Sequence, residues 1–178
     1  MKILFFAAAL ILVVTAQSFA QNKSVYTSTR AAACRTIESH PEEAGYYEGE
    51  CKGIGGYKIR FIEGDLRQTL DIITPAKKKF ELNFWHYYYT FSYIGEKIEW
   101  RTKKGVPVEL IARFNVADIN IDNKTISYLM ISKIGKKSSC VTDVVPPGEK
   151  QNEKARELAD LAETKPCKPT GSNCCGGT

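Results

Sequence analysis

The N-terminal leader constrains this chain more than any other feature. Residues 1–20 contain Lys2, an almost unbroken apolar run, and the small residues Ser18 and Ala20 at the −3 and −1 positions of a cleavage site, which is the pattern of a cleaved export signal. The apolar run is shorter than the about 20 residues that span a bilayer, and no cysteine follows the cleavage point to accept a lipid. We therefore predict an exported, periplasmic or extracellular chain without a transmembrane anchor, which folds in an oxidising compartment.

Length and charge favour one ordinary domain. Removing the leader from the 178 residues leaves 158, enough for a single hydrophobic core. We expect a single domain over residues 21–168 and a flexible tail over residues 169–178. The mature chain carries 24 basic and 20 acidic residues, interspersed except at residues 77–79, so we expect no nucleic-acid partner. The lysine triplet is interpreted as a solvated loop, in preference to a contact for anionic lipid or glycan.

The sequence positions of four of the six cysteines suggest two disulfide bonds. Cys34 and Cys51 lie close together near the mature N-terminus, and Cys140 and Cys167 bracket a loop and a helix near the C-terminus. We predict the disulfides Cys34–Cys51 and Cys140–Cys167. Each bridge is expected to stabilise the fold by roughly 3 kcal/mol, mainly by restricting the unfolded chain.

The other two cysteines, Cys174 and Cys175, lie in a glycine-rich tail. They are expected to pair with each other or to form an intermolecular disulfide. Two thiolates without a nearby histidine make only half of a zinc site, so metal binding is the weaker interpretation.

Alternating apolar and polar residues predict a sheet through the middle of the chain. Residues 57–61 and 66–72 alternate on either side of a Gly-Asp turn, which is a hairpin signature. Further strands are expected over residues 87–94, 97–102, 108–116, 126–134 and 140–144, with turns at residues 95–96, 104–105 and 122–124. A short helix is expected over residues 29–37, followed by a turn at residues 41–45.

The C-terminal part predicts one amphipathic helix. Asn152 is a suitable N-cap, and the apolar positions that follow at helical spacing are Ala155, Leu158, Ala159 and Ala162. The charged positions expected to turn away from the sheet are Arg156, Glu157, Asp160 and Glu163. Because the stripe is mostly alanine, we expect the helix to depend on the Cys140–Cys167 bridge. Short turns and one helix together predict an α+β fold: a meandering antiparallel sheet of about six to seven strands, disulfide-stapled, with one C-terminal helix packed on it.

No motif indicates an enzyme. His40 and His86 are the only histidines, and neither lies in a recognisable catalytic setting. We expect no catalytic residue, no metal and no cofactor. The glycines of residues 53–56 lead into a strand instead of a helix, which argues against a phosphate-binding loop. Paired carboxylates that act on glycans stay open as an alternative, and the available residues are Glu42, Glu43, Glu48 and Glu50.

The densest feature is an aromatic segment. Residues 80–93 hold eight of the sixteen aromatic residues of the mature chain. In a strand, one face carries Tyr87, Tyr89, Phe91 and Tyr93, which we expect to fill the core. The remaining Trp85, His86 and Tyr88 would, if exposed, form a stacking platform for a sugar ring or a hydrophobic partner. Packing at the core or its rim is the preferred interpretation.

Charged residues occupy the opposite positions of the expected strands. The basic ones are Lys58, Arg60, Arg67, Arg101 and Arg113, and the acidic ones are Asp71, Glu99 and Glu109. Cross-strand ion pairs, each contributing roughly 0.2 to 1 kcal/mol, are the preferred interpretation. The alternative is an arginine-rich face that binds an anionic polymer or an acidic protein.

Several short motifs together resemble a known group of proteins. They are Cys51-Lys52-Gly53, Gly56-Tyr57, Gly64-Asp65-Leu66-Arg67, Ile98-Glu99-Trp100-Arg101, Ile111-Ala112-Arg113, Cys140-Val141, and a helix with Ala155-Arg156 and Ala159-Asp160 before Cys167. In order and spacing the chain resembles a group of small exported bacterial proteins of unknown function with two intradomain disulfides. The resemblance implies a single domain in the bacterial periplasm or exterior, and the same two bridges. It transfers no activity, and the tail with Cys174 and Cys175 departs from it.

These observations favour a non-enzymatic binding protein of the bacterial envelope. Its partner would be an envelope polymer or another exported protein, which it could inhibit. The expected ligand contacts are Trp85, Tyr88, Arg60, Arg67, Arg101 and Arg113. The alternatives are a cell-wall glycan hydrolase with paired carboxylates and an envelope-structural subunit linked through its tail cysteines.

Overall fold

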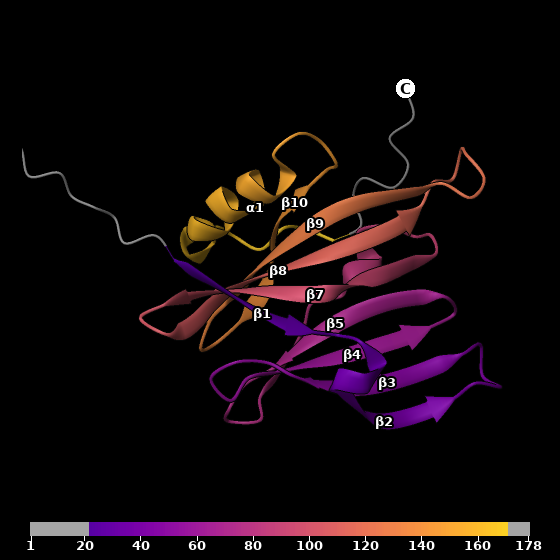
Figure 1. The fold of residues 1–178 in the computed structure, drawn as a ribbon, viewed down its shortest axis with the longest axis horizontal. Coiled ribbons are helices and arrows are strands. Elements are labelled where there is room, and N and C mark those ends of the chain that lie inside the picture. Colours follow the sequence, from indigo (N-terminus) through magenta and orange to yellow (C-terminus); the bar gives the residue numbers. More distant parts are fainter. Residues whose placement is uncertain (1–21, 171–178) are drawn as a thin grey trace, which may run out of the picture.

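A computed structural model describes residues 22–170 (Figure 1). The expected signal peptide and the expected pairing of Cys174 and Cys175 lie outside the described residues. Ten strands, three short 3-10 helices and one α-helix follow in the order β1 Lys23–Ser28, η1 Ala31–Ala33, β2 Cys34–His40, β3 Tyr46–Lys52, β4 Lys58–Gly64, β5 Arg67–Ile73, β6 Lys79–Glu81, η2 Phe84–His86, β7 Ser92–Lys103, β8 Val106–Ala117, β9 Thr125–Ile134, β10 Ser139–Val145, α1 Gln151–Asp160 and η3 Ala162–Thr164. None of the helices within this range is long and apolar enough to cross a bilayer.

All ten described strands belong to one sheet, and the α+β class is confirmed. The strand order is β10-β9-β8-β7-β5-β4-β3-β2, with β1 added to β7 and β6 added to β5. Every pairing is antiparallel except a parallel contact between β5 and β7 at Arg67 and Ser92. The strand count exceeds the expected number because β1, β2, β3 and the three-residue β6 carry little apolar alternation and were not predicted. The two strands expected over residues 87–94 and 97–102 are replaced by the single strand β7.

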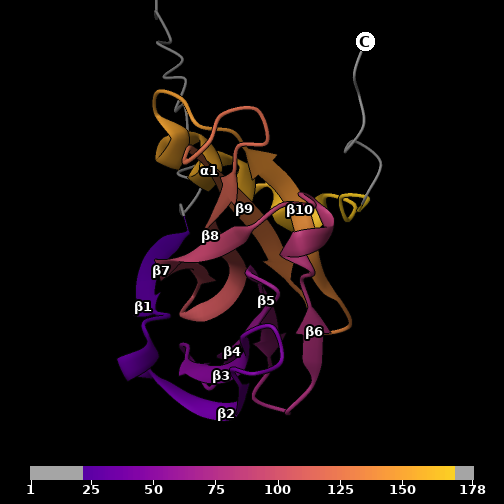
Figure 2. The ribbon, with the colours of Figure 1, turned by 90° about the vertical axis from the view of Figure 1, so that its right-hand side faces the viewer.

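The sheet curves so that its N-terminal strands face its C-terminal strands across the main core (Figure 2). Trp100 of β7 and Phe114 of β8 are fully buried in this core, together with Leu70 of β5. The Trp100 indole donates a hydrogen bond to Thr27 Oγ1 at 2.8 Å. Burial of large apolar side chains from both halves therefore holds the curved sheet closed.

The helix covers the other face of strands β8 to β10 (Figure 1). Ala155, Ala159 and Ala162 are fully buried against apolar residues of these strands, and Leu158 is partly buried. The alanine stripe is thus confirmed as the docking face. Because alanine side chains are short, the helix backbone lies close to the sheet, and little apolar area is removed from water.

Three local predictions are wrong. The helix begins at Gln151 with Lys150 as its N-cap, so Asn152 lies inside it and does not cap it. Instead of a helix over residues 29–37, the chain makes one 3-10 turn and then β2, because Cys34 lies directly opposite Cys51 in an extended strand pair. Residues 95–96 form no turn: β7 runs through them with a register shift between Ile94 and Ile98. A bulge of this kind lets one long strand twist strongly without ending.

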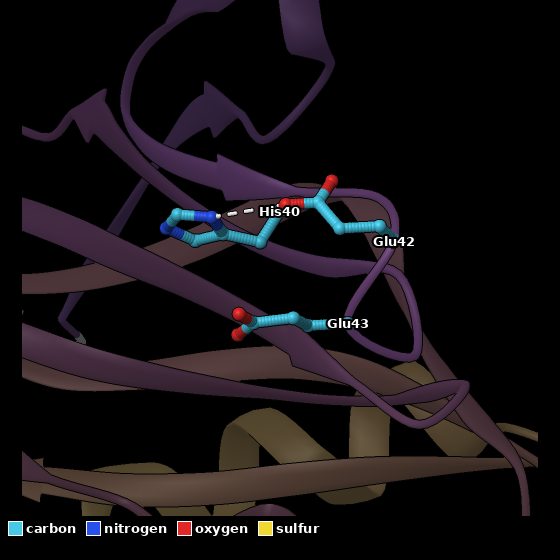
Figure 3. Close-up of side chains that lie close together, drawn as sticks. All are labelled: His40, Glu42 and Glu43. Carbon is cyan, nitrogen blue, oxygen red and sulfur yellow. Dashed lines mark ion pairs between the residues drawn. The ribbon is translucent and has the colours of Figure 1, made fainter.

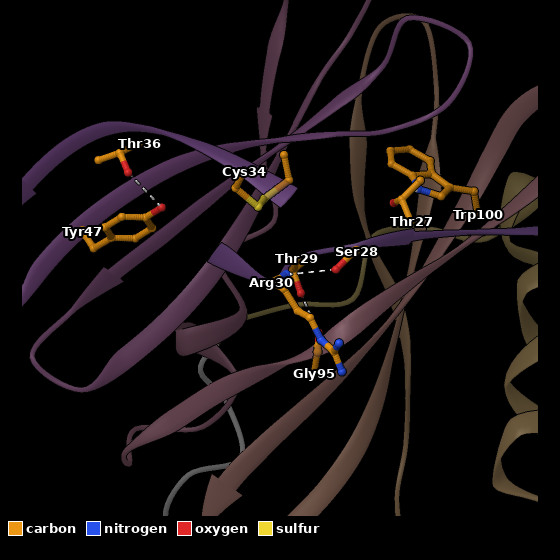
Figure 4. The surroundings of a disulfide bond; sticks show 10 residues. Thr27, Ser28, Thr29, Arg30, Cys34, Thr36, Tyr47, Gly95 and Trp100 are labelled. Atoms are coloured by element: carbon orange, nitrogen blue, oxygen red, sulfur yellow. Dashed lines mark hydrogen bonds between the residues drawn. A yellow bond between two sulfur atoms is a disulfide. The ribbon is translucent and has the colours of Figure 1, made fainter. Parts of the chain in front are cut away.

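Both predicted disulfides are present. Cys34 and Cys51 join β2 to β3 beside the end of β1 (Figure 4). Cys140 and Cys167 join β10 to the segment that follows η3. The second bridge fastens the chain just beyond the helix, as the sparse alanine stripe led us to expect.

Candidate functional site

The aromatic segment does not form the predicted strand. After Asn83, in the left-handed region at φ 49°, the chain makes the η2 turn, and the Phe84 amide donates to Thr69 Oγ1 at 2.8 Å. The strand begins only at Ser92. Consequently Tyr89, Phe91 and Tyr93 are 60%, 56% and 51% exposed, and their predicted place in the core is wrong.

This connection instead forms one wall of an open groove of about 800 Å³. The aromatic lining residues are Tyr87, Tyr88, Tyr89 and Tyr128, and the main aliphatic ones are Ile119, Ile126, Val144, Pro146 and Pro169. We call this the tyrosine groove. The Tyr88 and Tyr128 rings stack with centroids 4.4 Å apart and planes inclined by 27°. The groove therefore combines aromatic faces with an aliphatic wall.

A few polar groups are fixed along the groove. Asp118 Oδ1 accepts a hydrogen bond from the Asn120 amide at 3.0 Å, and Asp118 Oδ2 lies 3.2 Å from Lys124 Nζ. The Asn120 amide, followed by Lys124, lowers the pKa of Asp118, so this carboxylate stays ionised at neutral pH. Tyr87 donates from its hydroxyl to the Lys168 carbonyl at 3.1 Å, and burial raises the pKa of this phenol.

The sequence predicts only part of this groove. Tyr88 lines it, whereas Trp85 is half-buried beside His86 and is not among the lining residues. The part of the lining that includes Ile119 and Tyr128 was not predicted. The sequence did carry one indication of this part of the groove: an isoleucine, Ile119, inside the polar turn between β8 and β9. In the structure its side chain is 84% exposed.

The candidate arginines do not share one surface. Arg60 pairs with Glu48 of the neighbouring strand, and Arg67 pairs with Asp65. Arg113 donates to Ser127 Oγ at 2.8 Å and to Gln151 Oε1 at 3.2 Å, which links β8 to β9 and the helix. These contacts favour the structural role that was preferred from the sequence.

Arg101 lies beneath the helix, and the expectation that it faces outward is wrong. It is 3% exposed and forms an ion pair with Asp160, in which Nη2 donates to both carboxylate oxygens, at 2.7 and 2.8 Å. Beside it Arg156 Nε donates to Glu99 Oε1 at 2.8 Å. Both Arg156 and Asp160 therefore turn toward the sheet, contrary to the helical projection. Burial opposes ionisation of Glu99, but the bonds from Arg156 and Ser24 outweigh it and lower the pKa of Glu99.

Glu109, near Arg101 and Asp160, makes the free energy of unfolding depend on pH. It is 1% exposed, and burial, assisted by the charge of Asp160, raises its pKa from 4.5 to about 7. A raised carboxyl pKa means that the folded state holds the proton more tightly. The stabilising contribution is complete below pH 4.5 and is lost as the pH rises through about 7. Asp71, whose pKa burial raises from 3.8 to about 6, acts in the same direction.

We expect Glu109→Gln to raise the free energy of unfolding at pH 8 by about 2 kcal/mol, because a neutral amide needs no ionisation in the buried site. At pH 4 the variant and the parent should be equally stable. Urea unfolding between pH 4 and 8 measures the difference. Glu157→Gln, at an exposed position of the helix, is the control and should change nothing. An unaltered pH slope in the Glu109 variant would contradict this account.

One surface turn could hold a cation. His40, Glu42 and Glu43 place ligand atoms within 4.8 Å of one another (Figure 3). The imidazole already has carboxylate neighbours, with Nε2 3.0 Å from Glu38 and Nδ1 3.4 Å from Glu42. Because Glu42 and Glu43 are exposed, hydrogen bonding within the turn accounts for the arrangement, and we assign no metal to it.

Glu50 is one of the carboxylates available for glycan hydrolysis. Glu50 has a lowered pKa, chiefly through its hydrogen bond from Lys58, whereas a general acid needs a raised one. The carboxyls with strongly raised pKa, Asp71 and Glu109, are each 1% exposed and do not line the tyrosine groove. Among its described lining residues, Asp118 is the single carboxylate.

Comparison of the chain with protein-family models, with curated proteins and with solved structures found no match.

Proposed function

We propose that this chain is an exported, non-enzymatic binding protein of the bacterial envelope, and that the tyrosine groove holds sugar rings of an envelope polymer. The observation that carries the proposal is the groove, with four tyrosines along a cleft of about 800 Å³. Aromatic rings offer flat apolar faces to the C–H faces of sugars. The fixed polar groups of Asp118 and Asn120 are suited to hydroxyl groups.

Export is supported by the leader and by the two intramolecular disulfides. Such bridges persist in oxidising compartments and are rare in the cytosol. An envelope polymer is the ligand class that an exported domain with an open, partly apolar cleft would meet there. A protein partner would use the same groove through its apolar side chains.

The alternatives have less support. A glycan hydrolase needs two carboxyl groups flanking one bond, and a single carboxylate lines the described groove. A structural subunit linked through Cys174 or Cys175 depends on residues outside the described range. Turnover of peptidoglycan that a carboxylate-to-amide change abolishes would favour the first, and a disulfide-linked multimer on a non-reducing gel the second.

The groove offers two matched pairs of variants. Tyr89 and Ile119 line it, whereas Tyr93 and Ile121 are exposed but do not. We expect Tyr89→Ala to weaken binding of soluble peptidoglycan oligosaccharides about tenfold, as the loss of one stacked ring implies. Ile119→Ser should weaken it to a smaller degree, and Tyr93→Ala and Ile121→Ser should leave the dissociation constant unchanged.

Calorimetric titration of each variant measures these constants, and its melting temperature shows that the fold is kept. Equal losses at lining and non-lining positions would contradict the proposal. So would the absence of oligosaccharide binding to the parent protein. In that case a single exported protein recovered from envelope extract by the parent, but not by Tyr89→Ala, would assign the groove to a protein partner.

A further inference from the structure

A second cavity lies on the outer face of the N-terminal strands. It measures about 380 Å³, and its charged lining consists of Arg35, Lys58, Arg60, Lys77, Lys79 and a single carboxylate, Glu50. These residues come from β2 to β6 and from the β5–β6 connection. Five cationic side chains around one small cavity are costly unless negative charge compensates them.

The strand register explains why these charges converge. Arg35 lies opposite Glu50, Glu50 opposite Arg60, and Arg60 opposite Asp71 on four neighbouring strands. Directly opposite residues point to the same face of a sheet. Lys58 is two residues from Arg60 and therefore shares that face.

Two connections bound the cavity at one end. Gly56, at φ 81°, approaches Pro75 so closely that a Cβ on the glycine would lie 3.4 Å from the proline ring. Lys77 follows in a left-handed turn at φ 62°, with its amide bonded to the Thr74 carbonyl. This turn places the Lys77 side chain in the lining.

Two carboxylates of this face lie deeper than its cations: side-chain exposure is 13% for Glu50 and 2% for Asp71, against 72% for Arg35 and 49% for Lys58. A third carboxylate, Glu81, lies opposite Asp71 and is exposed, but it is engaged by Lys79 at 3.0 Å. The exposed charge that is left over on this face is therefore positive.

The carboxylates compensate the five cations only in part. Arg60 pairs with Glu48, and Lys79 pairs with Glu81 at 3.0 Å, so the shortage of negative charge concerns the other three cations. Glu50 is shared between Lys58 at 2.6 Å and Arg35 at 3.5 Å, so it cannot neutralise both. Among the described residues, Lys77 has no ion-pair partner. Asp71 Oδ2 lies 3.5 Å from Lys79 yet accepts no hydrogen bond.

We propose that this cavity is an anion site that binds a phosphate group. A phosphate presents several acceptor oxygens to one guanidinium fork and to lysine ammonium groups, in bonds about twice as strong as neutral ones. The phosphate would belong to a soluble compound or to a lipid headgroup. The site is separate from the tyrosine groove, and the two have no lining residue in common.

The test uses inorganic phosphate as the probe and two matched double variants. Lys58→Gln with Lys77→Gln removes two cations from the cavity. The control, Lys103→Gln with Lys104→Gln, removes two cations that do not line the cavity. Lys103 matches Lys58, because each pairs with a glutamate, Glu163 or Glu50. Lys104 matches Lys77, because both have a left-handed backbone, at φ 53° and 62°. At low ionic strength, the cavity variant should raise the dissociation constant for phosphate about tenfold, and the control variant should raise it less than about twofold.

Phosphate titration followed by calorimetry, with melting curves for each variant, gives the result. Equal losses in the two double variants, or no saturable phosphate binding by the parent, would overturn the proposal. Vesicles of phosphatidylglycerol and of phosphatidylcholine distinguish the sources. When phosphate binds, additional cavity-dependent binding to the anionic vesicles assigns a lipid headgroup, and phosphate binding with no cavity-dependent binding to vesicles assigns a soluble compound. Tyr89→Ala should keep phosphate affinity whether or not the groove binds sugars, so either proposal can fail alone.

Discussion

Replacing Asp160 by Asn is expected to lower the free energy of unfolding by about 3 kcal/mol, because it leaves a buried guanidinium without its partner. Arg101 is 3% exposed, and both oxygens of Asp160 accept bonds from it. Glu99 lies 3.9 Å from Arg101 but is already engaged by Arg156. The remaining charge would have to stay unpaired or draw water under the helix. Urea unfolding at pH 7 measures the loss.

Asp65→Asn is the matched control. It makes the same chemical change in an exposed pair with Arg67, and asparagine tolerates the left-handed backbone of Asp65 at φ 51°. Its cost should stay below about 1 kcal/mol. A combined Arg101→Met and Asp160→Asn variant should recover part of the loss, since no buried charge then lacks a partner. Similar costs for Asp160→Asn and Asp65→Asn would show that the buried pair does not hold the helix.

Removing the Cys140–Cys167 bridge should have an effect of comparable size. With the two cysteines 27 positions apart in the sequence, the double serine variant is expected to lose about 3 kcal/mol by the loop-entropy account, a fall in melting temperature of roughly 6–12 °C. The helix and the η3 turn after it bury mainly Ala155, Ala159 and Ala162, so their docking has little apolar area to replace the bridge.

Hydrogen exchange distinguishes this bridge from the other one. In the variant without Cys140–Cys167, amides of α1 should exchange faster than those of β3. In a variant without Cys34–Cys51, the edge strand β2 should lose protection while α1 keeps it, because that bridge joins only β2 to β3. Unchanged protection of α1 after loss of Cys140–Cys167 would contradict the role given to this bridge.

Local patterns predicted much of the fold. The hairpin of β4 and β5 and the turn at Lys104 and Gly105 follow from alternation beside turn residues, and these signals act over a few residues. The disulfide pairs follow from nearness in the sequence. The strands β1, β2, β3 and β6 were not predicted. The partner of β1 is far away in the sequence, β6 has only three residues, and β2 and β3 carry little apolar alternation.

The groove was predicted less well for a physical reason. In residues 87–93, aromatic residues occur at both odd and even positions, so a period of two cannot tell a strand from an irregular connection. The left-handed Asn83 and the bond from Phe84 to Thr69 decide the outcome, and both depend on tertiary contacts. Likewise, alternation placed Arg101 opposite the core correctly, but it could not indicate that a helix would cover that side.

The pairing of β1 with β7 bears on the sequence of events during folding. Ser24 lies opposite Arg101 and bonds to it, a separation of 77 residues. In the exported chain that we propose, β1 leaves the translocation channel before β7 and cannot pair with it until β7 has also emerged. Contacts between residues so far apart in the sequence are slow to form. β2 to β5 can meanwhile join as neighbouring hairpins. We therefore expect β1 to join the sheet late in folding. Its pairing with β7 then forms the hydrogen bonds between Ser24 and Arg101 and between Thr27 and Trp100.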